Sequence, residues 1–239
     1  GTVQGLLDMA RIPYVGCGLL ASAACMDKAH THMVLDYHNI KTARWRMITH
    51  RNMNHLDKQY EEIAEELRFP LFVKPVNCGS SIGINKANDF EELDDAVKTA
   101  FSHDNKVIIE EFIKGRELEV AVAGYDSPYA SYVGEIKACN DFYDYDAKYV
   151  LGDSELCIPA DIDDEKMKEI RETAIKAYKV LGCKGLSRVD FFMTENGDVY
   201  LNEINTLPGF TPISMYPKLM EHLGMSQSYL VDQLIEQAI

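Results

Sequence analysis

The chain has 239 residues, enough for one large domain or for two ordinary ones with their own cores. Its 24 basic and 38 acidic residues give a net charge of −14, which argues against general binding of nucleic acid. No apolar run reaches the roughly 18 to 20 residues of a membrane span, and no signal peptide opens the chain, so we expect no membrane partner. Six scattered cysteines without a C-x-x-C pair favour free thiols in a reducing cytoplasm.

Hydrophobic periodicity and turn residues predict helices and strands at intervals along the chain. After an amphipathic opening, we expect helices at 18–36, 57–67, 90–100, 163–181, 214–222 and 226–238. We expect strands at 42–48, 70–76, 81–87, 106–113, 117–125, 129–138, 187–193 and 198–205. This mixture, with several hairpins, favours an α+β fold in two lobes, and Gly115 is a natural boundary between them.

The stretch SRVDFFMTENGDVYLNEIN, at 187–205, predicts a β-hairpin around Asn196-Gly197, the strongest short-range hairpin signal. If that pair is a two-residue loop, Asp190 lies opposite Glu203 and Arg188 lies opposite Asn205. Like charges directly across a ladder destabilise it, so two carboxylates placed together need a reason. On this register one face of the hairpin carries Arg188, Asp190, Phe192, Val199, Leu201, Glu203 and Asn205.

A divalent cation bound by Asp190, Glu203 and Asn205 removes the like-charge penalty, and Mg²⁺ suits one or two carboxylates together with substrate phosphates. Arg188 beside them supplies positive charge for a phosphate or a developing anion. The alternative is an ordinary exposed hairpin with surface charges, against which the apolar flanks argue. The pattern therefore favours a metal site.

The loop KPVNCGSSIG, at 74–83, joins two expected strands. Gly79, Ser80 and Ser81 offer backbone N–H groups and hydroxyls to an anion, and the Lys74 ammonium can reach a phosphate from the end of the strand. The segment lacks the G-K-[ST] of a Walker A loop, and no helix obviously follows it. A tight polar loop without a ligand is an equal alternative.

Two further segments have weaker signals. In VIIEEFIKGRELEV, at 107–120, the chain between the lobes can present backbone groups to a purine and acidic side chains to a ribose. Taken alone, these acidic residues fit a charged surface better. The irregular stretch around DFYDYDAKYV, at 141–150, is either a lid that excludes water and adds the cation Lys148, or a variable aromatic surface loop.

The stretch NTLPGFTPISMYP, at 205–217, follows the expected metal face directly. A helix beginning near Ser214 presents its N-terminus there, which favours an anion such as a carboxylate. This predicts a second substrate that carries a carboxylate. The seven histidines, most of them at 30–55, show no ligand spacing, and we expect them at the surface.

Taken together, these segments resemble the D-alanine–D-alanine ligases of the ATP-grasp superfamily, over nearly the whole chain. The matching segments are MDK at 26–28, FVKPVNCGSSIGI at 72–84, IIEEFIKGRELEVAV at 108–122, FYDYDAKY at 142–149, SRVDFF at 187–192 and LNEINTLPGFTPISMYP at 201–217. The resemblance implies two α+β lobes that sandwich ATP. It divides the chain into a remnant of an N-terminal substrate domain at 1–27, a central lobe at 28–115, and a C-terminal lobe with the metal and second-substrate site at 116–239.

The resemblance also implies roles for individual residues. It implies nucleotide binding by Lys28, Lys74, Ser80, Ser81, Glu110, Glu111, Phe112, Ile113, Glu117, Lys148 and Asn202. It implies that two Mg²⁺ or Mn²⁺ ions are held by Asp190, Glu203 and Asn205. It implies catalytic roles for Arg188, Gly209, Ser81 and Tyr149, of which Arg188 and Gly209 stabilise a tetrahedral intermediate. It implies that Ser214 and Met215 contact the second substrate.

The implied reaction serves peptidoglycan synthesis. ATP phosphorylates the carboxylate of one D-alanine, and the amine of a second D-alanine attacks the acyl phosphate. The full-length protein is then expected to be a cytoplasmic homodimer. Most of the family's first domain is missing from this chain, so a nucleotide-binding fragment without catalysis is an alternative. A ligase that joins D-alanine to D-serine or D-lactate is another, although Tyr149 and the apolar Met215 resemble the D-alanine-selecting type.

Overall fold

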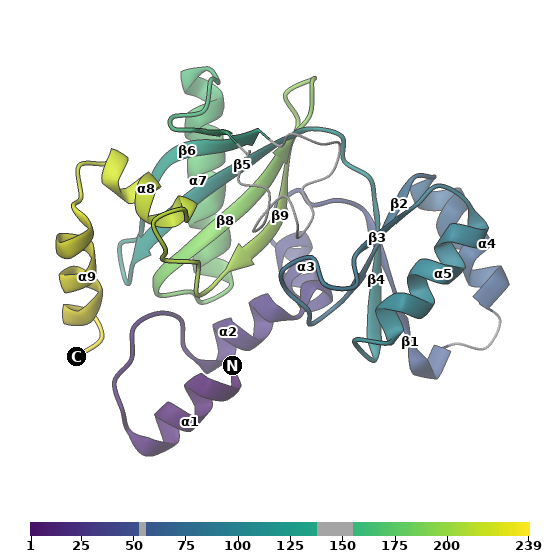
Figure 1. Cartoon of the computed structure of the whole chain (residues 1–239), viewed down its shortest axis with the longest axis horizontal. Coiled ribbons are helices and arrows are strands. Elements are labelled where there is room, and N and C mark those ends of the chain that lie inside the picture. Colours follow the sequence, from purple (N-terminus) through teal and green to yellow (C-terminus); the bar gives the residue numbers. More distant parts are fainter. Residues whose placement is uncertain (53–55, 138–154) are drawn as a thin grey trace.

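The computed structural model describes residues 1–52, 56–137 and 155–239, and these form two antiparallel sheets with separate hydrophobic cores. Figure 1 shows the two sheets side by side, with α3 (Lys28–Tyr37) between them. The α+β fold expected from the sequence is confirmed. None of the helices in the described residues has both the length and the apolar character that crossing a bilayer requires.

The smaller sheet has four strands in the order β1-β4-β2-β3. They are β1 (Trp45–Thr49), β4 (Lys106–Glu111), β2 (Leu71–Pro75) and β3 (Asn85–Ala87). A short 3₁₀ helix, η1 (His50–Asn52), follows β1, and α4 (Leu56–Leu67) and α5 (Phe90–Phe101) pack their apolar faces on the sheet. Asp89 caps α5, because its side chain accepts the backbone N–H of Glu92 at 2.9 Å.

The larger sheet has five described strands in the order β7-β6-β5-β8-β9. They are β7 (Glu155–Cys157), β6 (Tyr129–Lys137), β5 (Arg116–Gly124), β8 (Gly185–Met193) and β9 (Val199–Asn205). The helix α7 (Asp164–Val180) covers one face, and α8 (Met215–His222) with α9 (Gln227–Glu236) covers part of the other.

The central strand β5 explains how both faces are filled. Leu118, Val120 and Val122 point into the core beneath α7, whereas Ala121 and Ala123 lie in the core beneath α8. The same alternation places Glu117 and Glu119 on the α8 side of the sheet, beyond the part that α8 covers. This uncovered end of the sheet is where the polar side chains of β8 and β9 also gather.

The N-terminal segment forms three helices, α1 (Thr2–Ala10), α2 (Leu19–Met26) and α3. The single helix expected at 18–36 is therefore wrong, because the chain is extended at Asp27 (φ −80°, ψ 99°). The Asp27 side chain accepts the backbone N–H of His30 and caps α3. This break lets α3 start directly beside the small sheet, while Leu35 further along α3 packs in the core of the large one.

The β8–β9 hairpin differs from the expected two-residue loop. Thr194 pairs with Asp198, whose carbonyl accepts the Thr194 N–H at 3.0 Å, so the loop is the three residues 195–197. Gly197 closes it with a positive φ of 80°, as is usual for three-residue hairpin loops. Near the loop the register is thus one residue away from the expected one, and Phe191 pairs with Leu201.

A β-bulge at Asn202 then restores the expected register, so that Asp190 lies opposite Glu203 and Arg188 opposite Asn205. The bulge also changes which side chains share a face. Val199 and Leu201, expected beside the carboxylates, instead pack in the core beneath α7. The extra residue turns Asn202 and Glu203 together towards the uncovered face of the sheet.

Candidate active site between the two sheets

A pocket of about 470 Å³ lies between the two sheets, within the usual size range of small-molecule sites. A second pocket of about 390 Å³ adjoins it on the large sheet, and both are lined by Ser80, Glu117, Asn202 and Glu203. The first pocket brings together the expected nucleotide residues Lys28, Lys74, Ser80, Ser81, Glu110, Glu111, Phe112, Ile113, Glu117 and Asn202. The second brings together Arg188, Asp190, Glu203, Asn205, Gly209, Ser214 and Met215. Lys148 and Tyr149 lie outside the described residues.

Lys28, the first residue of α3, extends into the first pocket. Its backbone N–H donates to the Val76 carbonyl at 3.1 Å, and its ammonium donates to the Cys78 carbonyl at 2.6 Å. Burial lowers the pKa of Lys28, with Lys74 acting in the same direction, while the carboxylate of Glu203 opposes the shift. A partly buried ammonium opposite a carboxylate suits the binding of an anionic group between the sheets.

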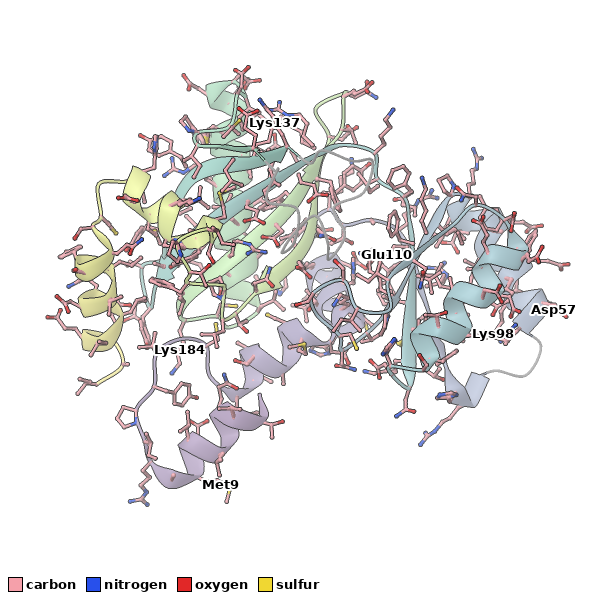
Figure 2. All side chains as sticks on the ribbon, in the orientation of Figure 1. Met9, Asp57, Lys98, Glu110, Lys137 and Lys184 are labelled. Carbon is pink, nitrogen blue, oxygen red and sulfur yellow. The ribbon has the colours of Figure 1, made fainter. Side chains whose placement is uncertain are left out.

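Lys74 is held by Glu110, a buried carboxylate that lines the pocket. The Lys74 ammonium lies 2.5 Å from Glu110 Oε2, and His32 Nε2 lies 3.0 Å from Glu110 Oε1. Burial alone raises the pKa of Glu110, but Lys74 and His32 outweigh it and hold this pKa far below its ordinary value. Glu110 is therefore ionised, and its carboxylate is engaged on both oxygens; Figure 2 shows it on the side of the small sheet nearest the large one.

The loop after β2 is anchored at its start. The Asn77 backbone N–H and side-chain amide donate to Asp104 Oδ2 at 2.7 and 2.9 Å. Further along, Ser80 and Ser81 have positive φ angles of 55° and 59°. Two consecutive non-glycine residues in this region are strained, and such strain is concentrated at functional sites.

The segment between the sheets forms one wall of the first pocket. The Glu111 side chain turns towards Arg44, accepting its backbone N–H and its Nε–H, both at 2.8 Å. The Phe112 ring lies 5.6 Å from the Phe72 ring, and the Lys86 ammonium lies 4.6 Å from its centre. Phe112 therefore offers an aromatic surface, and the backbone of 112–115, outside both sheets, is left to face a ligand.

One guanidinium, that of Arg188, holds two carboxylates of the large sheet, Asp190 and Glu119. Arg188 donates through Nε and Nη2 to the two oxygens of Asp190, both at 2.7 Å, and Arg188 Nε lies 3.0 Å from Glu119. Asn205 Nδ2 lies 2.9 Å from Asp190 Oδ2 and 3.3 Å from Glu203 Oε1. Burial lowers the pKa of Arg188, but Asp190 and Glu119 outweigh it and raise this pKa well above its ordinary value. The like charges are thus held together by Arg188 and Asn205.

These residues fit a hard cation that shares its coordination with a ligand. In the described residues, no group of three or more His, Cys, Asp or Glu is placed to hold a metal by itself. Asp190 and Glu203 supply two carboxylates, and half a turn of the Asn205 amide places its oxygen where the nitrogen now lies. Such a set suits Mg²⁺, which binds through one or two carboxylates with substrate phosphates.

The second pocket is closed by the turn before α8. The Ser214 hydroxyl accepts the Thr211 backbone N–H at 3.0 Å, and the Ser214 backbone N–H donates to the Thr211 carbonyl at 2.9 Å. Met215 lines the pocket but is 4% exposed, because its side chain packs in the core beneath α8. The start of α8 therefore faces the metal candidates as expected.

Sequence reasoning missed two polar groups near the first pocket. His32, expected at the surface, is 3% exposed and bonded to Glu110. Glu135 of β6 lines the pocket and forms a two-point ion pair with Arg116, at 2.7 and 2.6 Å. The one signal for His32 is its position four residues after Lys28, which places both on one face of a helix.

The fold and this site were compared with known proteins. The family model for the D-Ala D-Ala ligase C-terminus matches residues 34–236. Over 242 residues the chain is 50% identical to the D-alanine–D-alanine ligase of Ruminiclostridium cellulolyticum, and it is 52% identical over 243 residues to ligase B of Clostridium tetani. It covers 64% and 67% of those two proteins, with its own full length aligned. The chain thus spans about two thirds of the length of the curated relatives it matches.

Solved structures of two ligases are similar to the chain over its whole length. The D-Ala:D-Ser ligase VanG of Enterococcus faecalis has a TM-score of 0.91 and 44% identity, with 100% of this chain and 69% of that chain covered. The D-alanine–D-alanine ligase of Coxiella burnetii has a TM-score of 0.86 and 38% identity, covering 100% and 63%. Two antiparallel sheets around a lysine-lined pocket, with these neighbours, define an ATP-grasp fold. The chain belongs to the D-alanine–D-alanine ligase family, of which it represents the C-terminal part.

Proposed function

We propose that the protein containing this chain is an ATP-dependent ligase that joins two D-alanines and releases ADP and phosphate. One observation carries the proposal. Lys28 of α3 and Lys74 of the small sheet line the first pocket. This pocket adjoins the second pocket, which is lined by Asp190 and Glu203 of the large sheet. The names of the relatives at 50% and 52% identity support the substrate class.

ATP binds, in this proposal, in the first pocket. Phe112 and Ile113, in the segment between the sheets, contact the adenine, and Glu110 and Glu111 fix the wall of the pocket beside it. Glu117 accepts hydrogen bonds from the ribose hydroxyls. Lys28, Lys74, Ser80 and Ser81 bind the phosphates, joined by Asn202 and by Lys148. The two partly buried ammonium groups and the strained loop are suited to this task, since their partners hold them before the ligand arrives.

Asp190, Glu203 and Asn205 hold Mg²⁺ or Mn²⁺ in this proposal, as two ions. When bound there, the ions would supply positive charge to the phosphates. Arg188, already held by Asp190 and Glu119, presents positive charge to the second pocket, where an acyl phosphate and its tetrahedral adduct form. The backbone of Gly209 helps Arg188 to stabilise the tetrahedral adduct. Ser81 and Tyr149 act as further catalytic residues beside the first substrate.

The reaction then needs no protein nucleophile. The carboxylate oxygen of one D-alanine attacks the γ-phosphoryl group and ADP leaves. The neutral amine of a second D-alanine attacks the acyl carbon, its proton is lost, and phosphate departs. The carboxylate of that second D-alanine lies near Ser214 and Met215, at the start of α8. Acceleration comes from positioning and electrostatics.

The wider role follows from the same proposal. The product dipeptide serves peptidoglycan synthesis in the cytoplasm, and the full-length protein acts as a homodimer. Residues 1–27 belong with a preceding substrate domain, 28–115 with the central lobe and 116–239 with the C-terminal lobe. A second candidate is a D-alanine–D-serine ligase, which the similarity to VanG favours. Two further alternatives are a ligase that uses D-lactate as the acceptor and a nucleotide-binding fragment without turnover.

A phosphate-release assay tests the proposal. The full-length protein is given ATP, Mg²⁺ and D-alanine, with D-serine or D-lactate as competing acceptor, and the dipeptide or depsipeptide product is identified by mass. The proposal predicts D-alanyl-D-alanine as the main product. Preferential formation of D-alanyl-D-serine favours the second candidate, and nucleotide binding without turnover removes the catalytic assignment.

A further inference from the structure

A buried histidine, His32, lies behind the two lysines of the first pocket, Lys28 and Lys74, and contacts the carboxylate that holds Lys74. His32 is 3% exposed and Glu110 is 5% exposed, so their contact is shielded from water. An ionised carboxylate can only accept hydrogen bonds. His32 Nε2 therefore carries the proton and donates it in a hydrogen bond to Glu110 Oε1 at 3.0 Å. The other oxygen, Oε2, holds the Lys74 ammonium at 2.5 Å. One carboxylate thus connects His32 to Lys74.

This connection also links two elements of the pocket. Lys28 and His32 lie one turn apart on the same face of α3, whereas Lys74 comes from β2 and Glu110 from β4. The backbone of Lys28 is bonded to Val76, just after β2, so α3 is attached to the small sheet at its first turn. The His32–Glu110 contact attaches it again at its second turn. Lys28 and Lys74 are therefore held at a fixed relative position.

We propose that His32 is a positioning residue for nucleotide binding, which fixes the Glu110 carboxylate and, through it, the direction of the Lys74 ammonium. The inference rests on the proposed function, because it takes the pocket to bind the phosphates of ATP. Without the His32 proton donor, Glu110 keeps one oxygen without its partner in a buried place and turns to satisfy it. Lys74 then loses its fixed direction towards the phosphates.

Three substitutions separate this role from simple packing. His32→Leu keeps much of the volume but removes the donor, whereas His32→Gln returns an N–H near the position of Nε2. His30→Leu is the matched control, because His30 is exposed on the same helix. The measurement is calorimetric binding of the non-hydrolysable ATP analogue AMP-PNP with Mg²⁺, together with the KM for ATP and for D-alanine in the full-length protein.

The expected result is a Kd for AMP-PNP about ten- to a hundredfold weaker in His32→Leu, the range for loss of a hydrogen bond to a charged group. His32→Gln recovers most of the affinity, and His30→Leu matches the wild type. The KM for ATP rises in His32→Leu while the KM for D-alanine stays unchanged.

Two results overturn the inference. One is a folded His32→Leu protein whose Kd lies within about twofold of the wild type. The other is an equal loss in His32→Leu and His32→Gln, which assigns the effect to the ring and not to its proton. If His32→Leu does not fold, His32→Asn, whose amide is too short to reach Glu110, is judged by the same criterion. Failure of the wild type to bind AMP-PNP contradicts the proposed function itself.

Discussion

At the scale of single residues, the site is organised by charged and polar side chains that hold one another, some of them close in sequence and others far apart. Arg188 and Asn205 hold Asp190 and Glu203 close together on the large sheet. On the small sheet, Glu110 is held by Lys74 and His32. Glu110 remains ionised although it is buried, because Lys74 and His32 lie beside its carboxylate.

Glu203→Gln tests the acidic pair. The substitution keeps the side-chain size but removes one charge, so we expect a folded protein whose Mg²⁺-dependent phosphate release falls by about two orders of magnitude or more. Glu195→Gln, in the exposed hairpin loop, is the control and should keep full activity. Near-normal turnover of Glu203→Gln with Mg²⁺ would remove Glu203 from the metal site.

Glu110 also predicts a dependence of stability on pH. Its pKa is lowered on folding from an ordinary value of 4.5, so the stability it contributes is fully present above that value and is lost as the pH falls through the folded pKa. Urea unfolding of the wild type should therefore lose stability below about pH 4.5 more steeply than that of Glu110→Gln. Parallel acid limbs in the two proteins would contradict the lowered pKa.

At the scale of elements, two small irregularities place the functional side chains. The bulge at Asn202 turns Asn202 and Glu203 to the same face, and the break at Asp27 lets α3 start beside the small sheet. The bulge interrupts the hydrogen bonds of the β8–β9 ladder, and the break interrupts those of the helix. Both irregularities lie next to candidate site residues. Such features are typically placed where a side chain has to be redirected.

Gly197→Ala tests the hairpin loop. At φ 80° an alanine is strained, so we expect the free energy of unfolding to fall by about 1 to 2 kcal/mol. Asn196→Ala, which has no positive φ, serves as the control and should change stability much less. An equal effect of both substitutions in urea unfolding would show that the loop does not depend on the conformation of Gly197.

Most of the element order could be predicted because it depends on local pattern, although 18–36 forms two helices and not one. The carboxylates of the hairpin and the loop at 74–83 stood out by their residues, whereas most other residues that line the two pockets were expected only from the family resemblance. Asp190 was expected opposite Glu203, and it lies there, although the reasoning was wrong at two steps: the loop is one residue longer, and the bulge at Asn202 compensates. Neither is visible locally, since both follow from packing Leu201 and Ile204 into the core. The burial of His32 was missed because its partner lies 78 residues away.

At the scale of the whole molecule, the site exists only where the two sheets meet. Each sheet has its own core, and the lysines that we propose to bind phosphate lie on one side while the metal candidates lie on the other. The connection at 112–115 joins β4 of the small sheet to β5 of the large one. At Gly115 an added Cβ would lie 2.5 Å from the Met193 carbonyl oxygen, so the connection passes too close to β8 for a side chain.

Gly115→Ala should therefore displace the connection and separate the two halves of the site. We expect weaker AMP-PNP binding by about tenfold and a lower free energy of unfolding. Gly18→Ala is the control, because its Cβ would meet nothing closer than 3.6 Å. If Gly115→Ala binds the nucleotide as tightly as the control does, the position of this connection does not determine the pocket.

The central claim is that a nucleotide binds between the sheets through Lys74 on one side and the Glu203 carboxylate, with Mg²⁺, on the other. The most direct measurement is calorimetric titration of the wild type, Lys74→Met and Glu203→Gln with AMP-PNP, with and without Mg²⁺. We predict one site in the wild type, weakened in Lys74→Met under both conditions, and a Mg²⁺-dependent gain in affinity that is lost in Glu203→Gln. Absence of binding in the wild type, or binding that neither substitution changes, would contradict the account.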